Sequence, residues 1–540
     1  FSGEIFLGKN IDLEKSKSKV QLADSFSALA TSASVGFAAL TTPVAFVRSS
    51  ADGTDRWWAN AGSLYKTTNT DPETGWALDA IGSSPTAALY DMIDFAGALI
   101  VPTSTNLSRL ASGVWTASWW TSLTGASALS AAPHRFAIFE GALVVTDGRF
   151  INDYDGTIVR DPALTLPVGF EARWVKVWRD LLFIGGIDTV GREANVYTWR
   201  RTLTTYESAF PIGDTEALCC FVVDVPYIVT KKGAIKRFNG AGFELVQQFP
   251  TVELNKAITL IHPNGIAVQE NIVRMLVNFG ASADIRVLSG LWTFDASNNN
   301  LYHSGSVKNS IGADYAQHEL VDVGAVTLTT PTQGSYLIGA RPYVDYGAST
   351  SRYGIFSSDE ENTSNRGYFI TPKIPSADAR NYWRYITAKV SRFQGAGDRL
   401  RVYFRQQEST TVPFDAPSYE NITWVDTTHF TGSNSSVQAG DLVEVIAGDN
   451  AGALERITAI AAGSPNTYTI ATAVYDSTAV ARARYIRAND IGNISSQSVE
   501  ESRFIVGAKS NFCQFIFQLV GDEQSPKIER LLLEFDAVPL

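Results

Sequence analysis

Two aspartates on either side of a tyrosine are the first residues whose types and spacing could support chemistry. Asp153 and Asp155 flank Tyr154 within GALVVTDGRFINDYDGT, residues 141–157. Alternate residues of a strand share a face, so the two carboxylates would lie together, with Tyr154 on the opposite face. Paired carboxylates can hold calcium, or cleave a glycosidic bond when they converge across a cleft. The alternative, which the Asp155-Gly156 pair favours, is that both acids form turns in an exposed hairpin.

A second group of acids lies in VQAGDLVEVIAGDNAGALERITAI, residues 437–460. Their spacing does not match the calcium loop of an EF-hand. The sequence therefore favours roles in turns or on a solvent-facing surface. The four acids are Asp441, Glu444, Asp449 and Glu455.

The cysteines and histidines do not indicate a metal or redox site. Cys219, Cys220 and Cys513 include a vicinal pair and are odd in number, which makes a poor disulfide framework. We predict buried free thiols in a protein made in a reducing compartment. The histidines are scattered and no Cys-x-x-Cys spacing occurs, so a zinc site is not expected. They are His134, His262, His303, His318 and His429.

Motifs of common enzyme classes are missing from the sequence. It contains no Gly-x-Ser-x-Gly elbow, no P-loop and no His-Glu-x-x-His. We therefore expect a protein that is not an enzyme, with no catalytic, cofactor-binding or metal-binding residues.

Two tryptophan doublets are candidates for an interface. In a strand, one Trp of each doublet would face the core and the other would face outward, where it could anchor a subunit contact or stack on a sugar. The alternative, which we favour, is packing between neighbouring sheets. The four residues are Trp57, Trp58, Trp119 and Trp120.

A repeat of short strands positions these residues. The stretch at 141–157 reads as an apolar strand, a Gly turn, a second strand and an Asp-Gly turn. Relatives of it are centred near residues 55, 97, 180, 225, 265 and 324. A period of roughly 40 to 50 residues built of short strands is typical of a β-propeller. The spacing predicts six or seven blades, the last either lengthened by an insertion or closed by an N-terminal strand. Predicted hairpin turns are Asp52-Gly53, Asp147-Gly148, Asp155-Gly156, Asn239-Gly240 and Asn264-Gly265.

The repeat of short strands ends at a polar stretch, residues 350–365. Long alternating strands follow, such as DRLRVYFRQQ, residues 398–407, and they predict a β-sandwich. The segment around 437–460 does not continue this pattern of long strands. Its strands and glycine turns predict a small barrel inserted at a loop of the sandwich. The all-β organisation that we predict is an N-terminal arm at 1–30, a β-propeller at 31–355, a β-sandwich at 356–430 and 495–540, and the inserted β-barrel at 431–494.

Composition and charge limit the partners. The chain has 540 residues, 45% of them hydrophobic and 18% charged, which is typical of folded domains with ample core. Its net charge of −11 argues against a surface that coats nucleic acid, but not against a channel through which DNA slides. No apolar run is long enough to span a bilayer, and the first ten residues do not form a secretion signal.

Several segments together resemble the tail proteins of tailed bacteriophages. FEGALVVTDGRFINDYDGT resembles a unit of their propellers. GYFITPKI, YWRYITAKV and SPKIERLLLEF resemble their terminal sandwich, and AGDLVEVIAGDNAGALERITAI resembles the small barrels that these proteins carry as insertions. The resemblance covers nearly the whole chain after residue 30 and is one of architecture.

The resemblance implies a structural virion protein, made in the host cytoplasm and located in the phage tail as a nozzle or tail-tip component. Copies would form a cyclic ring that gates or guides DNA exit, with DNA passing through the lumen without specific binding. Adjoining tail, adaptor or fibre proteins would be partners. The alternatives are a carbohydrate-binding or glycan-cleaving β-propeller and, less favoured, a scaffold that binds proteins through its propeller face.

Overall fold

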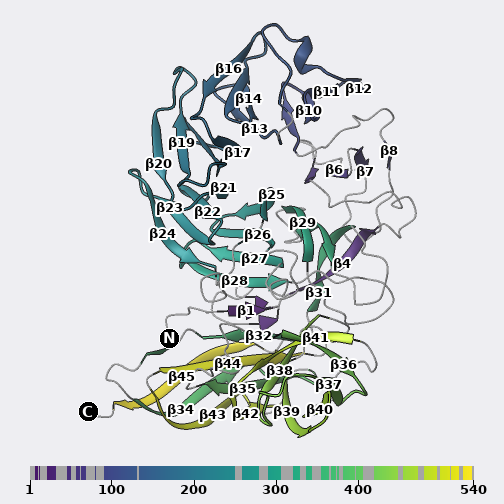
Figure 1. Ribbon diagram of the computed structural model, residues 1–540, viewed down its shortest axis with the longest axis vertical. Helices are drawn as coiled ribbons and strands as arrows, with labels where there is room; N and C mark the ends of the chain where they lie inside the picture. Colours follow the sequence, from purple (N-terminus) through teal and green to yellow (C-terminus); the bar gives the residue numbers. More distant parts are fainter. Residues whose placement is uncertain are drawn as a thin grey trace.

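In the computed structural model, strands are the main secondary structure of the described residues (Figure 1). Among the described residues, the single helix is a 3-10 turn, Trp120–Ser122. The structure describes residues 91–130, 133–249, 260–278, 290–305, 366–371, 381–393, 399–405, 419–447, 454–471, 480–495, 499–510, 512–521 and 527–537, together with shorter segments, most of them strands, in the rest of the chain.

Seven four-stranded antiparallel sheets account for most of the described residues up to 363. We number them 1 to 7. In sheets 1 to 6, four consecutive strands pair in chain order. The strands of sheets 1 to 4 are β5 (Phe46–Ser49), β6 (Arg56–Asn60), β7 (Ser63–Thr67) and β8 (Asp79–Ala80); β9 (Ile93–Phe95), β10 (Ala98–Pro102), β11 (Leu107–Ala111) and β12 (Val114–Thr116); β13 (Phe136–Phe139), β14 (Ala142–Asp147), β15 (Phe150–Tyr154) and β16 (Val159–Thr165); and β17 (Phe170–Trp178), β18 (Leu181–Asp188), β19 (Asn195–Trp199) and β20 (Ser208–Pro211).

Sheet 7 differs because its fourth strand comes from the N-terminus. β4 pairs with β31, the last strand of the repeat region. The strands of sheets 5 to 7 are β21 (Ala217–Val222), β22 (Pro226–Thr230), β23 (Ala234–Phe238) and β24 (Phe243–Gln248); β25 (Leu260–Gln269), β26 (Ile272–Asn278), β27 (Gly290–Asp295) and β28 (Asn300–Gly305); and β29 (Leu320–Leu328), β30 (Tyr336–Pro342), β31 (Gly354–Thr363) and β4 (Asp24–Thr31).

The seven sheets are arranged around a ring, so the fold is propeller-like (Figure 1). The first strands of successive sheets contact one another: β9 with β13, β13 with β17, β17 with β21, β21 with β25, β25 with β29, and β29 with β5. Each sheet therefore presents its first strand to the inside of the ring.

Tight turns explain why the repeat is visible in the sequence. Glu140 and Gly141, between β13 and β14, have φ of 49° and 76°, and Ala96 and Gly97 occupy the same place in sheet 2 with 49° and 72°. Two successive residues with positive φ form the type I′ turn, whose twist matches that of the flanking strands and which favours glycine. The repeat positions near 97 and 141 mark this turn. Those near 180 and 225 lie between the first and second strands of sheets 4 and 5, without two successive positive φ values. Those near 265 and 324 fall within the first strands β25 and β29, and residue 55 lies outside the described residues.

A second group of sheets lies beside the ring (Figure 1). A six-stranded sheet and a three-stranded sheet share one buried core, in which Trp383 and Ile386 pack with Phe515 and Phe517. Its strands are β1 (Leu7–Lys9), β32 (Arg366–Ile370), β44 (Phe512–Val520), β35 (Arg399–Arg405), β42 (Asn489–Ile494) and β33 (Ile374–Pro375) in the larger sheet, and β43 (Glu501–Ser510), β34 (Asn381–Val390) and β45 (Ile528–Ala537) in the smaller.

A small closed barrel is inserted between β35 and β42 of the larger sheet. Its interior is filled, with Phe430, Tyr468 and Tyr485 packed in series. A separate pair of short strands, β2 (Ile11–Asp12) and β3 (Gln21–Leu22), lies near the N-terminus. The barrel strands, in order around the barrel, are β36 (Tyr419–Trp424), β37 (His429–Gly432), β40 (Asn466–Ile470), β39 (Leu454–Ala461), β38 (Leu442–Ala447) and β41 (Val480–Ile486).

Several predicted boundaries need correction. The barrel strands run from 419 to 486 rather than 431 to 494, because β42, at 489–494, pairs with β35 of the larger sheet. The polar stretch at 350–365 contains strand β31. The described residues of 1–30 are not a separate arm, since β1 pairs with β32 and β4 with β31.

The predicted hairpin turns have mixed outcomes. Gly148, Gly156 and Gly240 occupy turns with positive φ, as predicted. Asn264-Gly265 lies instead inside β25, where the register with β26 shifts between Ile261 and Ile266. The pair therefore accommodates an irregularity in the strand, which is the other common use of glycine in a sheet. Asp52-Gly53 lies outside the described residues.

One hydrophobic core crosses from the ring into the second group of sheets. It contains Phe221 and Trp292 of the ring, Tyr368 and Ile516 of the six-stranded sheet and, from the barrel, Leu442. Strand β1 also contacts β28 of sheet 6. The ring, the six-stranded sheet and the barrel are thus joined by continuous packing.

Candidate functional site: buried ion pairs between sheets

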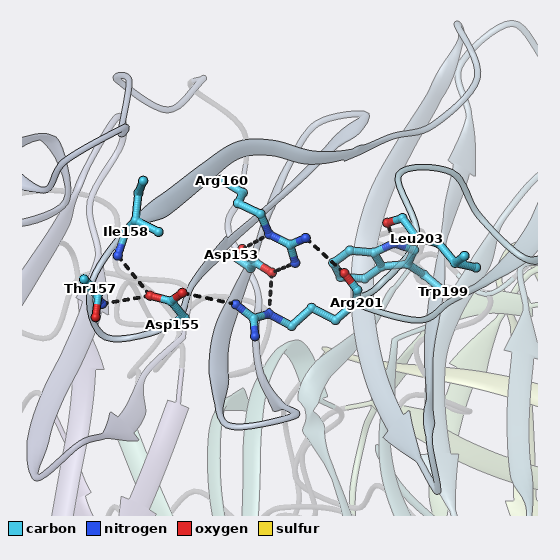
Figure 2. Close-up of polar contacts among 8 residues, drawn as sticks. All are labelled: Asp153, Asp155, Thr157, Ile158, Arg160, Trp199, Arg201 and Leu203. Atoms are coloured by element: carbon cyan, nitrogen blue, oxygen red, sulfur yellow. Dashed lines mark hydrogen bonds and ion pairs between the residues drawn. The ribbon is translucent and has the colours of Figure 1, made fainter.

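Asp153 lies buried between sheets 3 and 4 and accepts hydrogen bonds from two arginines (Figure 2). Arg160 sits opposite it on the neighbouring strand β16 and donates from Nε to Oδ1 at 2.8 Å, while its Nη2 contacts Oδ2. Arg201, in the segment after β19 of the next sheet, donates from Nε to Oδ2 at 2.7 Å. The hydrogen bond with Asp153 raises the pKa of Arg160. The carboxylate therefore ties sheet 3 to sheet 4.

Asp155 has a different role from Asp153. Its Oδ1 accepts the backbone N–H groups of Thr157 at 2.8 Å and Ile158 at 2.9 Å. The hydrogen bonds from Ile158 and Thr157 lower its pKa. This is the turn role that the sequence favours for the acid. Asp153, by contrast, is no turn residue, so the prediction is right for one acid and wrong for the other.

The two acids do not form a catalytic pair in this arrangement. Both oxygens of Asp153 accept guanidinium N–H groups, and Asp155 lies 3.8 Å from Nη2 of Arg201. A general acid or a nucleophile needs a carboxylate that faces substrate rather than guanidinium groups. The arrangement is suited to holding sheets 3 and 4 in one relative position.

The barrel carries a second buried ion pair. Glu444, on β38, contacts Nε of Arg484 on β41, and its Oε1 accepts a hydrogen bond of 2.8 Å from the Tyr368 hydroxyl group. Arg484 donates from Nη2 to the Tyr368 hydroxyl oxygen at 2.9 Å. Burial raises the pKa of Tyr368 well above its ordinary value, so the phenol stays protonated and donates. Because Tyr368 belongs to β32 of the six-stranded sheet, this cluster connects the barrel to that sheet.

A further ion pair crosses the same boundary. Arg401 of β35 donates from Nη1 to Glu455 of β39 at 2.7 Å, and both side chains are buried. Beside it, Gln518 of β44 donates from Nε2 to the carbonyl oxygen of Leu454 at 2.8 Å. Burial raises the pKa of the neighbouring Tyr403 to about 12. The inserted barrel is therefore attached to the six-stranded sheet by charged as well as apolar contacts.

The prediction for the barrel acids is wrong for Glu444 and Glu455. Asp441 keeps a turn role, because its Oδ2 accepts the backbone N–H of Gln438 at 2.9 Å. Asp441, Glu444 and Glu455 are all buried and none faces solvent. Asp441 pairs with Arg487, whose Nε lies 3.0 Å from Oδ1. Sequence spacing could not reveal these pairs, because the partners lie 40 to 54 residues away in the chain. Asp449 lies outside the described residues.

The tryptophan candidates are mostly internal. Trp119 and Trp120 lie at a 3-10 turn and are both buried in one core with Phe95 and Leu129, so neither faces outward. The strand assumption fails there, because a 3-10 turn does not alternate its side chains between two faces. Trp57 is also buried, with Nζ of Lys66 lying 5.7 Å from its ring centroid. The side chain of Trp58 lies outside the described part of the structure.

The three cysteines are free and buried, as predicted. Burial raises their thiol pKa values, that of Cys220 to about 12. Thiolate is the reactive form, so these side chains behave as small apolar residues at neutral pH. Among the described residues, no group of three or more His, Cys, Asp or Glu side chains is placed to hold a metal ion. No helix within the described ranges has the length and apolar character needed to cross a membrane.

No protein-family description matches this sequence, and no curated protein matches it. Solved structures do match. The extracellular domain of the hybrid two-component system BT4673 from B. thetaiotaomicron has a TM-score of 0.43 and 11% identity, over 82% of this chain and 55% of that one. The WD40 domain of Neurospora crassa Pan2 has a TM-score of 0.40 and 10% identity, over 64% and 98%. The WD40 β-propeller domain of Doa1 has a TM-score of 0.39 and 11% identity, over 62% and 98%. At these TM-scores and identities, the matches carry no information on activity or partners.

Proposed function

We propose that the seven sheets are the blades of a seven-bladed β-propeller and that the six- and three-stranded sheets form a β-sandwich. The pairing of β4 with β31 supports a ring in which the two ends of the repeat region share one blade. The shared core of Trp383, Ile386, Phe515 and Phe517 supports the sandwich.

We further propose that the chain is a structural virion protein of a bacteriophage tail, a nozzle or tail-tip component. Copies of it form a cyclic ring that gates or guides DNA exit and holds fibres or adjoining tail proteins. No catalytic step is assigned to the chain. The resemblance of its segments to phage tail proteins motivates the proposal.

The observation that best supports this role is the way the modules are joined. A continuous core runs from Trp292 of the ring through Ile516 of the six-stranded sheet to Leu442 of the barrel. The buried pair of Arg401 and Glu455 fixes the barrel on the same sheet. Buried ion pairs contribute little net stability, and in some proteins they specify one geometry. A protein that lines a DNA channel must keep its shape while DNA passes, and rigidly joined modules meet this requirement.

The charge of the chain is compatible with the proposed lumen. A net charge of −11 disfavours tight binding to phosphates, since affinity for DNA depends on lysines and arginines that displace counterions. DNA that moves through a weakly repelling channel is not held. The passage of DNA needs no base-specific contact.

Imaging of intact particles from a host that makes this chain tests the proposal. Electron microscopy is expected to show several copies in a ring around the tail axis, with masses that fit the propeller and the sandwich. Mass spectrometry of the same purified particles is expected to find the chain. Absence of the chain from the particles would overturn the proposal, and so would glycan cleavage by the purified chain at a rate typical of enzymes.

A further inference from the structure

The hairpin turn between β23 and β24 of sheet 5 contains an Asn-Gly pair, Asn239-Gly240. Both residues are exposed, and Gly240 has a φ of 93°. The backbone N–H of Asn239 closes the turn by donating to the carbonyl oxygen of Gly242 at 3.0 Å. Within the described part of the chain, no hydrogen bond from the N–H of Gly240 is found. The nitrogen of Gly240 is therefore accessible and carries no neighbouring side chain of its own that would block it.

Two backbone N–H groups bind the side-chain oxygen of Asn239. Its Oδ1 accepts hydrogen bonds from the N–H groups of Ala241 and Gly242, both at 3.0 Å. Because these donors lie two and three residues ahead, they fold the carboxamide back over the chain that follows it, toward the nitrogen of Gly240. Donors at this distance also stabilise negative charge that develops on an oxygen, so they favour attack at the amide carbon.

We propose that Asn239 is a self-modification site, at which the backbone nitrogen of Gly240 converts the side-chain amide into an acid. The nitrogen bonds to Cγ of Asn239, the Cγ–Nδ2 bond breaks, and ammonia leaves with the proton of the Gly240 N–H. Water then opens the cyclic imide and leaves aspartate or isoaspartate at position 239. Solvent supplies this water, because the turn is exposed. The reaction does not depend on the proposed function.

A second turn with the same hydrogen bonds shows why the residue must be an amide. Asp155 precedes Gly156, and its Oδ1 accepts the N–H groups two and three residues ahead. These hydrogen bonds lower the pKa of Asp155, which is therefore a carboxylate at neutral pH. Its negative charge repels the electron pair of an attacking nitrogen, whereas the carboxamide of Asn239 is neutral. The turn at Asn239 is thus reactive, and the turn at Asp155 is not.

The other Asn-Gly pair, Asn264-Gly265, lies in a setting that disfavours the reaction. It falls inside β25, and Gly265 is buried. A strand directs its side chains to the faces of the sheet rather than along the following backbone, and burial keeps water from the imide carbon. The sequence ranks the two pairs equally, so the fold selects Asn239.

The product changes the charge of the hairpin formed by β23 and β24, on the outer side of the ring (Figure 1). Nδ2 of Asn239 donates to Oε2 of Glu244 at 3.5 Å, and Oε1 of Glu244 accepts from Nη2 of Arg237 at 2.7 Å. Conversion replaces the amide donor with a second carboxylate beside Glu244, and like charges repel. Isoaspartate also lengthens the backbone of the turn. Hydrogen exchange in β24 is therefore expected to quicken as position 239 is converted.

Peptide mapping by mass spectrometry of the full chain, warmed at mildly alkaline pH, tests the proposal. In the folded chain, Asn239 is expected to lose its amide about tenfold faster than Asn264. In the chain unfolded in urea, the two pairs are expected to react at similar rates, because only the local sequence then matters. Equal rates at the two positions in the folded chain overturn the proposal. Slower conversion of Asn239 in the folded chain than in the unfolded chain overturns it too, since the turn would then protect the amide.

Asp155→Asn is the matched variant, because it supplies an amide to a turn with the same hydrogen bonds. It is expected to acquire the reaction at position 155, at a rate similar to that at position 239. Asn239→Gln is the control, since its longer side chain would have to close a larger ring. It is expected to abolish conversion at position 239 and to leave position 264 unchanged. An amide that stays intact at position 155 in Asp155→Asn overturns the role assigned to the turn.

Discussion

Nε of Arg201 lies 2.7 Å from a carboxylate oxygen of Asp153, across the boundary between two successive sheets of the ring. The acid belongs to the third sheet and the arginine to the fourth, 48 residues later. Asp153 is fully buried, while Arg201 keeps 21% of its side-chain surface. One carboxylate thus fixes both the sheet-to-sheet contact and the loop that follows β19.

Replacing Asp153 with Asn is expected to lower stability strongly. The change removes the negative charge between two guanidinium groups that then face each other, Arg160 and Arg201. Loss of one partner from a buried ion pair costs about 3–5 kcal/mol, and the partial exposure of both arginines places the expected loss at about 2–4 kcal/mol. Denaturant unfolding monitored by tryptophan fluorescence measures it. Asp155→Asn is the control, since Asn also accepts the turn hydrogen bonds, and its effect on stability is expected to be much smaller than that of Asp153→Asn. Equal losses in the two variants would contradict this assignment.

Replacing Glu455 with Gln is expected to loosen the barrel. Arg401 then keeps its charge without the carboxylate that faces it, at a cost of about 3–5 kcal/mol. Hydrogen exchange is expected to rise in β39 and in the strands of the larger sheet that face it. The double variant Glu455→Gln with Arg401→Met is expected to recover part of the loss, because the unpaired charge is gone. Arg456→Gln is the control for an exposed pair, since its guanidinium lies 3.8 Å from Asp490. The single variant Arg401→Met completes the comparison. If the double variant loses more stability than the two single variants together, the pair itself is not the cause.

Acid is expected to weaken the turn between β36 and β37. The backbone N–H of Thr428, followed by its hydroxyl group and by His429, lowers the pKa of Asp426 to about 2. The folded-state pKa lies below the ordinary value of 3.8, so this group stabilises the fold fully above that value. The contribution is lost as the pH falls from about 4 to about 2. Asp426→Asn is expected to flatten the dependence of the unfolding midpoint on pH in that window and not at neutral pH. An unchanged slope would exclude a contribution from Asp426.

Removal of the N-terminal strand β4 is expected to open sheet 7. A chain that lacks residues 1–31 loses β4, so β31 still pairs with β30 but its other edge is left unpaired. An unpaired edge strand promotes aggregation and loses the sheet contacts that close the ring. A chain that lacks only residues 1–12 is the matched control, because it retains β4. Calorimetry is expected to show a lower midpoint for the shorter chain, together with aggregation on heating. Identical behaviour of the two truncated chains would mean that β4 does not stabilise the ring.

Local signals were sufficient to predict the repeat and the all-β class. Turns such as Ala96-Gly97 and Glu140-Gly141 require positive φ, and this requirement places a glycine at the same point of two successive sheets. The alternation in DRLRVYFRQQ, residues 398–407, predicts one apolar face, and Leu400, Val402 and Phe404 of β35 are indeed buried together in one core. Where two uses of one residue type look alike, as at Asn264-Gly265, the sequence alone could not distinguish a turn from an irregular strand.

The sequence by itself determined the all-β class and most of the glycine turns, because each depends on neighbours in the chain. Only the tertiary structure decided that the second face of β35, with Arg401 and Tyr403, is buried as well, since the surface that covers it comes from the distant barrel. The same holds for Asp153 and Glu455. A carboxylate in a turn and a carboxylate in a buried ion pair look the same in the sequence. Their difference lies in the electrostatic environment that folding creates from residues far apart in the chain.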